Sequence, residues 1–140
     1  VRGASAGGYS PLLAIAASPN FAAAASLYGV SDPDSLRKVT HKFEGDYLDW
    51  LLGSPEQFVV RAPLEQVAQI NTPVIFFQGG RDVVVVPEQT ADMVSALKQQ
   101  GVTVAYHLYP EEGHGFRQAQ HLAEVLRLEL AFYQQAFQAN

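Results

Sequence analysis

Three stretches of the chain carry apolar residues in runs that are typical of strands. Residues 21–28 (FAAAASLY) form a nearly continuous apolar run, which predicts a strand buried on both faces, although its alanines also suit a helix. The run TPVIFFQGG, between Pro73 and two glycines, predicts an interior parallel strand. Residues 102–108 alternate Val, Val, Tyr and Leu with other side chains, which predicts a third strand.

Between and after these runs, apolar residues recur at helical spacing. We expect a helix at residues 9–17, a second that opens at Pro87 and ends at Gly101, and a long amphipathic helix at the C-terminus. The residues that define the last helix are Leu122, Leu126, Leu130, Tyr133 and Phe137. An order in which strands and helices alternate predicts an α/β fold with a parallel sheet.

Residues 31–70 interrupt this alternation. The segment contains a turn cluster (SDPDS) and short helical pieces around two glycines, Gly45 and Gly53. We interpret residues 31–70 as a lid-like insertion. The remainder of the 140-residue chain is long enough for one domain with a substantial core.

Composition excludes several classes of protein. The net charge is −5 and the nine Lys and Arg residues form no basic run, which argues against nucleic-acid binding. No apolar run reaches membrane-spanning length, so we expect no membrane partner and a cytoplasmic location. The chain has no cysteine, which excludes disulfides and thiolate chemistry.

The first residues contain a motif for a catalytic serine. Gly3-Ala4-Ser5-Ala6-Gly7 matches Gly-x-Ser-x-Gly, the turn that projects a serine hydroxyl between a strand and a helix. We expect Gly3 and Gly7 to permit this tight turn, and the backbone N–H of Ala6 to face a developing oxyanion. The motif alone is weak evidence, because the chain has 11 glycines.

Two further residues complete a candidate triad. Asp82 and His114 each follow a predicted strand, and the order Ser5, Asp82, His114 is the one that α/β-hydrolases use. Loops at the carboxyl ends of parallel strands line the functional crevice, so the three side chains are expected to meet there. Imidazole would take the serine proton during attack, and the carboxylate would orient the imidazole.

Other residues compete for these roles. Asp32 follows the preceding strand and is an alternative acid. His107 is expected within a strand, His121 on the polar side of a helix and His41 in the irregular segment, so we favour His114 as the base.

Two further groups of residues need an interpretation. Glu111 and Glu112 precede His114, but two adjacent acids at a strand end are interpreted as solvated, and we expect neither a metal nor another cofactor. Tyr47 and Trp50 are interpreted as packing residues of the lid, with substrate contact as the alternative.

Several longer segments resemble the catalytic domain of the prolyl oligopeptidase family, in particular its acylaminoacyl-peptidase and dipeptidyl-aminopeptidase branch. These are GASAGGYS, SLYGVSD, THKFEGDYLDWLLG, PVIFFQGGRDVVVVPEQ and EEGHGF, and the similarity covers nearly the whole chain. The resemblance implies a serine peptidase with Ser5 as nucleophile, Asp82 as orienting acid and His114 as general base. It also implies an α/β-hydrolase sheet of which residues 1–140 form the C-terminal portion.

The resemblance carries further expectations. Relatives have an N-terminal β-propeller and an earlier half of the sheet, with the second oxyanion donor upstream of the nucleophile, so we expect these parts outside residues 1–140. Val84 stands where several relatives have Arg or Asn, which argues against dipeptidyl-type anchoring. Val85 is expected by resemblance to line the primary specificity pocket.

Three functions follow as hypotheses: a peptidase that cleaves short peptides or acylated amino acids, a carboxylesterase with the same triad, and a non-catalytic α/β interaction domain. Because the sheet edge nearest Ser5 is expected to be open, we also predict that the isolated chain self-associates. We expect it to have little or no activity, because it has only the Ala6 N–H of the oxyanion hole.

Overall fold

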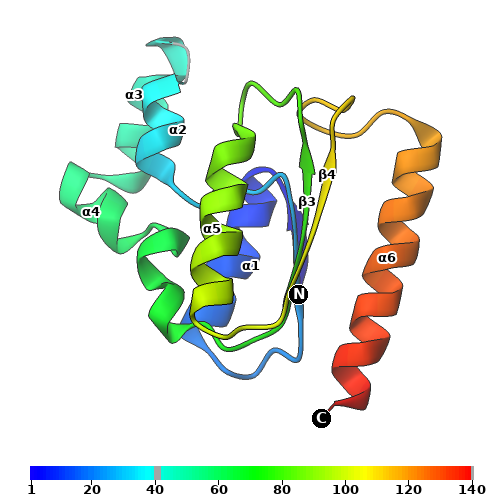
Figure 1. The fold of residues 1–140 in the computed structure, drawn as a ribbon. Helices are drawn as coiled ribbons and strands as arrows, with labels where there is room; N and C mark the ends of the chain where they lie inside the picture. Colours follow the sequence, from blue (N-terminus) through cyan, green and yellow to red (C-terminus); the bar gives the residue numbers. More distant parts are fainter. Residues whose placement is uncertain (40–41, 140) are drawn as a thin grey trace.

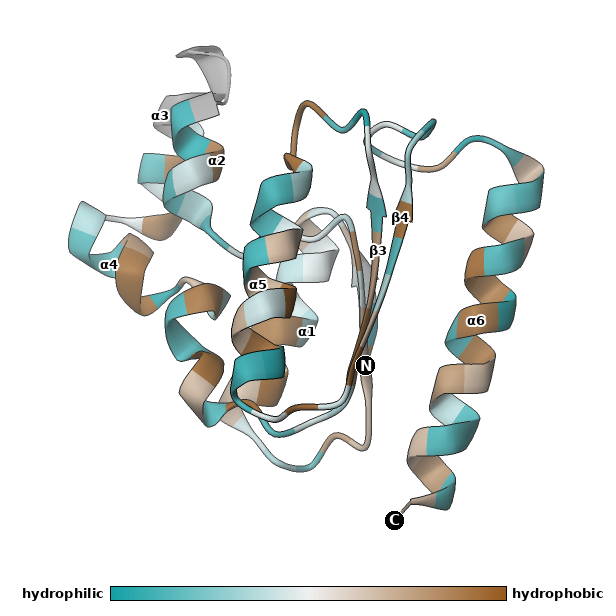
Figure 2. Ribbon diagram, viewed as in Figure 1, coloured by the Kyte–Doolittle hydropathy of each residue, from teal (hydrophilic) through white to brown (hydrophobic). Residues whose placement is uncertain are grey.

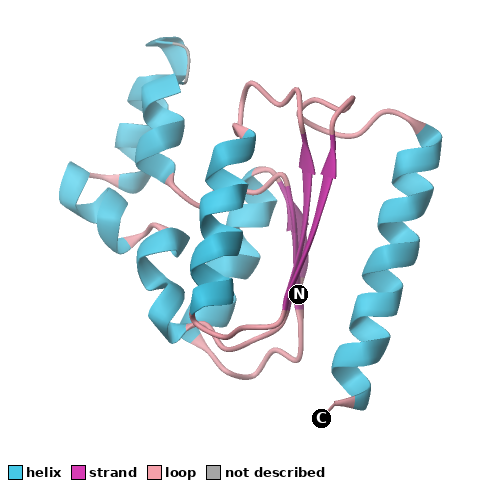
Figure 3. Ribbon diagram, in the orientation of Figure 1, coloured by secondary structure: helices cyan, strands magenta, loops and turns pink. Residues whose placement is uncertain are grey.

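The computed structural model describes residues 1–39 and 42–139, and its sheet is parallel, as the sequence predicts. The strands are β1 (Arg2–Ala4), β2 (Ala24–Leu27), β3 (Val74–Gly79) and β4 (Val104–Tyr109). They pair in the order β1-β2-β3-β4. All three pairings are parallel, so the carboxyl ends of the strands meet at one edge of the sheet, and the arrows of β3 and β4 point the same way in Figure 3.

Helices connect the strands and cover the sheet on both sides. They are α1 (Ala6–Ala17), α2 (Pro33–Val39), α3 (Lys42–Leu52), α4 (Pro55–Val60), the 3-10 helix η1 (Pro63–Gln69), α5 (Pro87–Gln99) and α6 (Ala119–Gln138). Helices α1 and α5 lie against one face and α6 against the other (Figure 1). No helix among the described residues is sufficiently long and apolar to cross a lipid bilayer.

The alternation of side chains along β3 divides the core into two clusters. Val74 and Phe76 pack with residues of α1, η1 and α5, whereas Ile75 and Phe77 pack with Val125 of α6. These four strand residues are at most 2% exposed, as expected for a parallel strand covered by helices on both faces. Figure 2 shows the brown hydrophobic segments of the strands between these helical layers.

Helix α6 packs with a different face from the one that leucine spacing suggests. Of the residues that the spacing selects, Tyr133 packs against the core. Leu126, Leu130 and Phe137 are instead 63%, 58% and 65% exposed. The packed face instead carries Val125 and Glu129, which are 2% and 5% exposed. Glu129 is accommodated because its carboxylate accepts hydrogen bonds from Arg2 Nε and from the Tyr133 hydroxyl, both at 2.8 Å.

The segment 31–70 has two parts in the structure. Helices α2, α3 and α4 lie outside the layer formed by α1 and α5 (Figure 1). By contrast, η1 contacts α1 and α5, and Val67 and Ile70 belong to the core. The interpretation of residues 31–70 as a lid-like insertion therefore stays a prediction for α2 to α4, while η1 is part of the packed domain.

Two adjacent glycines at the start of α1 have opposite surroundings. A Cβ added to Gly8 would lie 2.6 Å from the Cα of Gly29, inside the contact distance of two backbones, so α1 and the segment after β2 approach closely there. A Cβ added to Gly7 would meet no atom within 4 Å. The close approach at the start of α1 therefore requires glycine at position 8, whereas position 7 has room for a side chain.

This difference makes a matched pair of substitutions informative. Gly8→Ala forces two backbones apart and should lower the free energy of unfolding by about 1–3 kcal/mol. Gly7→Ala restricts the unfolded chain without a clash and should raise the free energy by up to about 1 kcal/mol. Urea unfolding of the 140-residue chain measures both, and equal effects of the two substitutions would contradict this packing.

Candidate active site

Ser5 stands in a strained turn between β1 and α1. Its backbone has φ 56° and ψ −123°, a conformation that non-glycine residues rarely adopt and that is held where it serves function. The Ser5 N–H donates to the carbonyl of Leu27 at 2.9 Å, which ties the turn to β2. Gly3 is required beside it, because a Cβ there would lie 1.7 Å from the carbonyl oxygen of Gly7.

The structure brings Ser5, His114 and Asp82 together at the carboxyl edge of the sheet. Ser5 Oγ lies 2.7 Å from His114 Nε2, and His114 Nδ1 lies 2.8 Å from Asp82 Oδ2. An ionised carboxylate only accepts hydrogen bonds, so it requires the imidazole proton on Nδ1. Nε2 of the neutral ring is then an acceptor, aimed at the Ser5 hydroxyl. This arrangement has the geometry needed to remove the serine proton during attack on a carbonyl.

Asp82 is a buried carboxylate with several donors. The residue is 3% exposed, and its Oδ1 accepts the N–H groups of Val84 at 2.9 Å and Val85 at 2.8 Å. Its Oδ2 accepts from His114 and lies 3.3 Å from Gln78 Nε2. These donors compensate the burial of a charge and fix the direction in which Oδ2 points.

Tyr28 supports the imidazole from the side. Its ring lies edge-on to His114, with ring centroids 5.1 Å apart and planes at 66°. It also contacts Phe116, and its backbone has a positive φ of 39°. Burial raises the pKa of the Tyr28 hydroxyl above its ordinary value, so the ring beside His114 is uncharged at neutral pH.

The N-terminus of α1 points at Ser5. Ala6 is the first residue of this 12-residue helix, so its backbone N–H belongs to the turn that has no intrahelical acceptor. The partial positive charge of the helix end therefore lies beside Ser5. The position of Ala6 is the one that the sequence motif predicts, and its role in an oxyanion hole stays a prediction.

An apolar cavity of about 90 Å³ adjoins Ala6. Its walls come from α1, from the segment after β2 and from helices α2 and α3: Ala6, Tyr9, Val30, Pro33, Leu36, Leu48, Leu51 and Leu52. Helix α3 thus contributes leucines to a cavity next to the Ser5 turn. Sequence reasoning missed these leucines, because their spacing in α3 indicates only an amphipathic helix.

The residues expected to line a substrate pocket lie elsewhere. Tyr47 and Trp50 are on α3 but are 56% and 80% exposed, with ring centroids 6.2 Å apart. Val85 is 1% exposed, and its backbone bonds to Asp82 and to Gln78. None of the three is among the cavity walls, so their contact with substrate stays a prediction.

The competing acid and histidines have structural partners of their own. Asp32 directly precedes α2, and its Oδ1 accepts the N–H groups of Asp34 and Ser35 at 3.1 and 3.2 Å. His107 lies in β4 and stacks on Phe77, and burial lowers its pKa. His121 bonds to Glu112, and His41 lies outside the described residues.

The interpretation of both acids before His114 as solvated is wrong for one of them. Glu111 is exposed and pairs with Arg81, but Glu112 is 3% exposed and accepts hydrogen bonds from the protein. Within residues 1–39 and 42–139, no three His, Asp or Glu side chains are grouped so that they could hold a metal ion.

Gln78 is a second supporting residue that sequence reasoning missed. It lies in β3 with 0% exposure, and its Nε2 donates to the Val85 carbonyl at 2.9 Å while its Oε1 accepts from Thr90 Oγ1 at 2.7 Å. The available signal was a polar residue inside the otherwise apolar run VIFFQG. A buried polar side chain in such a strand needs partners, and one of those of Gln78 is the Asp82 carboxylate.

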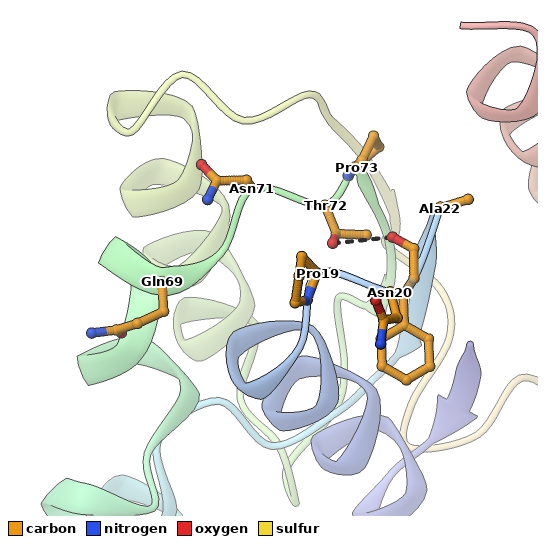
Figure 4. A pocket seen from close by; sticks show the side chains of 8 residues that line it. Pro19, Asn20, Ala22, Gln69, Asn71, Thr72 and Pro73 are labelled. Atoms are coloured by element: carbon orange, nitrogen blue, oxygen red, sulfur yellow. Dashed lines mark hydrogen bonds between the residues drawn. The ribbon is translucent and has the colours of Figure 1, made fainter. Parts of the chain in front are cut away.

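A larger, open cavity of about 380 Å³ lies at the opposite end of the sheet. It is lined by Pro19, Asn20, Phe21, Ala22, Gln69, Asn71, Thr72 and Pro73 (Figure 4). Thr72 Oγ1 donates there to the carbonyl of Phe21 at 3.2 Å. The lining has no charged group, and its one nucleophilic group is the Thr72 hydroxyl.

Known proteins are similar to this chain in sequence and in fold. A crystal structure of puromycin hydrolase is 37% identical, with a TM-score of 0.92 over 98% of this chain and 22% of its own. A puromycin-hydrolyzing peptidase from Mycobacterium tuberculosis is 39% identical, with a TM-score of 0.92 over 96% of this chain and 21% of its own. Dipeptidyl peptidase family member 6 of Caenorhabditis elegans is 32% identical over 89% of this chain and 18% of its own.

These likenesses identify the parallel sheet as one of the α/β-hydrolase type. The chain spans about a fifth of the length of these relatives, between 18% and 22%. The sequence matches the prolyl oligopeptidase family over residues 1–140. A match along the whole chain, together with relatives of more than 30% identity, shows that the chain belongs to the prolyl oligopeptidase family of serine-type peptidases.

Proposed function

We propose that this chain supplies the catalytic residues of a serine peptidase that hydrolyses short peptides or acylated amino acids through an acyl-enzyme. The observation that carries the proposal is the continuous series of hydrogen bonds from Ser5 Oγ through His114 to the buried Asp82. The strained backbone of Ser5 at the N-terminus of α1 supports the same assignment. Residues 1–140 would form the C-terminal portion of the catalytic domain.

Each residue has a role in the proposed reaction. Ser5 Oγ attacks the substrate carbonyl carbon while His114 Nε2 takes the hydroxyl proton, and the Ala6 N–H donates to the resulting oxyanion. His114 then passes the proton to the leaving amine as the carbon–nitrogen bond breaks. A water molecule, deprotonated by His114, hydrolyses the acyl-serine and restores Ser5. Asp82 stays ionised and stabilises the imidazolium.

The apolar cavity beside Ala6 suggests the preferred side chain at the cleaved bond. Its walls are leucines, Val30 and Pro33, with the Tyr9 ring as the aromatic member. A pocket of this composition favours a small or apolar side chain and offers no partner for a charged one. Puromycin, an aminoacyl amide that the names of two relatives give as substrate, is therefore a suitable first compound to assay.

The chain spans about a fifth of the length of its relatives, so other parts of the catalytic domain are expected to come from outside residues 1–140. We propose that a longer protein contains this chain and supplies the second oxyanion donor and a propeller domain. A carboxylesterase with the same three residues is the second candidate, since the triad geometry serves esters as well as amides.

The acid assignment can be tested with matched substitutions in that longer protein. Asp82→Asn removes the charge that fixes the imidazole tautomer and should lower kcat by roughly 10⁴ while the fold is kept. Asp32→Asn is the control, because asparagine caps a helix as well as aspartate does, and activity should stay unchanged. Steady-state kinetics on an aminoacyl anilide measures both. Loss of activity in the Asp32 variant alone would move the acid to Asp32.

Substrate class and nucleophile can be tested together. We expect a fluorophosphonate probe to label the longer protein and Ser5→Ala to abolish labelling, because the hydroxyl is the reacting group. We expect the protein to hydrolyse aminoacyl anilides and puromycin in addition to simple acyl esters. Turnover of esters alone would favour the carboxylesterase, and absence of labelling would favour a non-catalytic interaction domain.

The isolated 140-residue chain should behave differently. Among the described residues β1 pairs only with β2, so its other edge is open to a second copy, and a two-fold dimer is the simplest product. With one oxyanion donor in place, turnover should fall by at least roughly 10²–10³. Sedimentation and an ester assay test both expectations, and a stable monomer with high activity would contradict them.

A further inference from the structure

Glu112 occupies a position in the His114 loop that its exposed neighbour Glu111 does not share. Its carboxylate accepts the N–H of Arg117 on Oε2 at 3.0 Å and the N–H of Gln118 on Oε1 at 3.0 Å. Oε1 also accepts from His121 Nδ1 at 2.8 Å. Only 3% of the residue is exposed, so the Glu112 carboxylate itself is buried.

The two backbone bonds close the loop that carries His114. They run from residue 112 to residues five and six positions later, so His114 lies inside a ring closed by the Glu112 side chain. Gly113 and Gly115 flank His114, and Gly115 has a φ of 83°. Glycines lose the most conformational freedom on ordering, so this loop depends on a closing contact more than most.

The backbone of Glu112 joins the same loop to the acid. Its carbonyl accepts the N–H of Arg81 at 2.9 Å, and Arg81 directly precedes Asp82. A Cβ added to Gly79 at the end of β3 would lie 2.6 Å from the Glu112 carbonyl oxygen, so the two loops are in close contact. The backbone of Glu112 thus holds the loop of His114 against the loop of Asp82.

The surroundings of Glu112 keep its carboxylate ionised. Burial opposes the charge, but the N–H of Arg117, the His121 ring and the N–H of Gln118 outweigh it and hold the Glu112 pKa below its ordinary value. The N-terminus of α6 adds a favourable field, because Gln118 caps that helix. A charged carboxylate that accepts from three groups is a stronger tie than a neutral amide would be.

We propose that Glu112 is a positioning residue for catalysis, whose carboxylate closes loop 112–118 and holds His114 between Ser5 and Asp82. This inference rests on the proposed function for its effect on turnover, but the loop closure itself is independent of activity. A residue that only capped α6 would support stability and leave the chemical step unchanged.

The test uses the longer protein with Glu112→Gln and, as the matched control, Glu111→Gln. The amide introduced by Glu112→Gln has a single acceptor oxygen, so at least one of the three donors loses its partner. Misplacement of His114 should lower kcat by roughly 10- to 100-fold, with KM within about twofold, because positioning acts on the chemical step. Glu111→Gln breaks an exposed ion pair with Arg81 and should leave kcat unchanged.

Amide hydrogen exchange provides a readout without substrate. In the unsubstituted protein the amides of Arg117 and Gln118 should exchange more slowly than exposed loop amides, and Glu112→Gln should speed their exchange while core strands are unaffected. If Glu112→Gln does not fold, exchange in the unsubstituted protein decides: protected amides support the closed loop, and freely exchanging amides overturn it.

Either of two results would overturn the proposal: an unchanged kcat in folded Glu112→Gln, or parallel losses in stability and KM without a loss in kcat. If the unsubstituted protein hydrolyses nothing, the proposed function fails. The exchange measurement then still reports whether Glu112 closes the loop.

Discussion

The Asp82 carboxylate is a buried charge, and the candidate site is arranged around the groups that make its burial possible. Removing a carboxylate from water costs several kcal/mol unless hydrogen bonds replace its hydration. Here the N–H groups of Val84 and Val85 take one oxygen, and His114 takes the other with Gln78 nearby. Two of these donors are backbone N–H groups, so the buried charge also fixes the conformation of the loop that follows Asp82.

The strained backbone of Ser5 is a second unfavourable contribution to the free energy of folding. The positive φ of Ser5 is of the kind that costs roughly 1–3 kcal/mol, and it persists only where neighbouring contacts hold it. The bond from Ser5 N–H to Leu27 and the approach of Gly3 to the carbonyl of Gly7 are such contacts. Strain at the nucleophile and charge at the acid are therefore both stabilised by backbone groups, while the imidazole between them is held by side chains.

Much of this arrangement could be predicted from the sequence, and the parts that could not have physical reasons. Continuous apolar runs identify β2 and β3, which are buried along their whole length, within a few residues. Alternating apolar residues identify β4, which is mostly half-buried. The order of Ser5, Asp82 and His114 places them in loops at one edge of a parallel sheet, where the structure has them.

Patterns fail where the partner of a residue is distant in sequence or lies outside the local pattern. The stripe of leucines on α6 is exposed, since the packed face carries Glu129, whose charge is matched by Arg2 from the far end of the chain. The three groups that donate to Glu112 come from the loop and helix that follow it, and no local pattern of apolar residues indicates them. The close approach of Gly8 to Gly29 joins two residues that are 21 positions apart.

The parallel register of the sheet has a consequence for how the triad tolerates change. Ala4 stands opposite Leu27, Leu27 opposite Phe77, and Gly79 opposite Tyr109, so the loops of Ser5, Asp82 and His114 start from fixed rungs of one ladder. A slip by one rung displaces a loop by about 3.3 Å and turns its side chains to the opposite face. That step exceeds the 2.7 Å that separates Ser5 Oγ from His114 Nε2. The strand register therefore fixes the alignment of the three side chains. Small movements of the loops leave this register intact, whereas the smallest possible change of register separates the three groups.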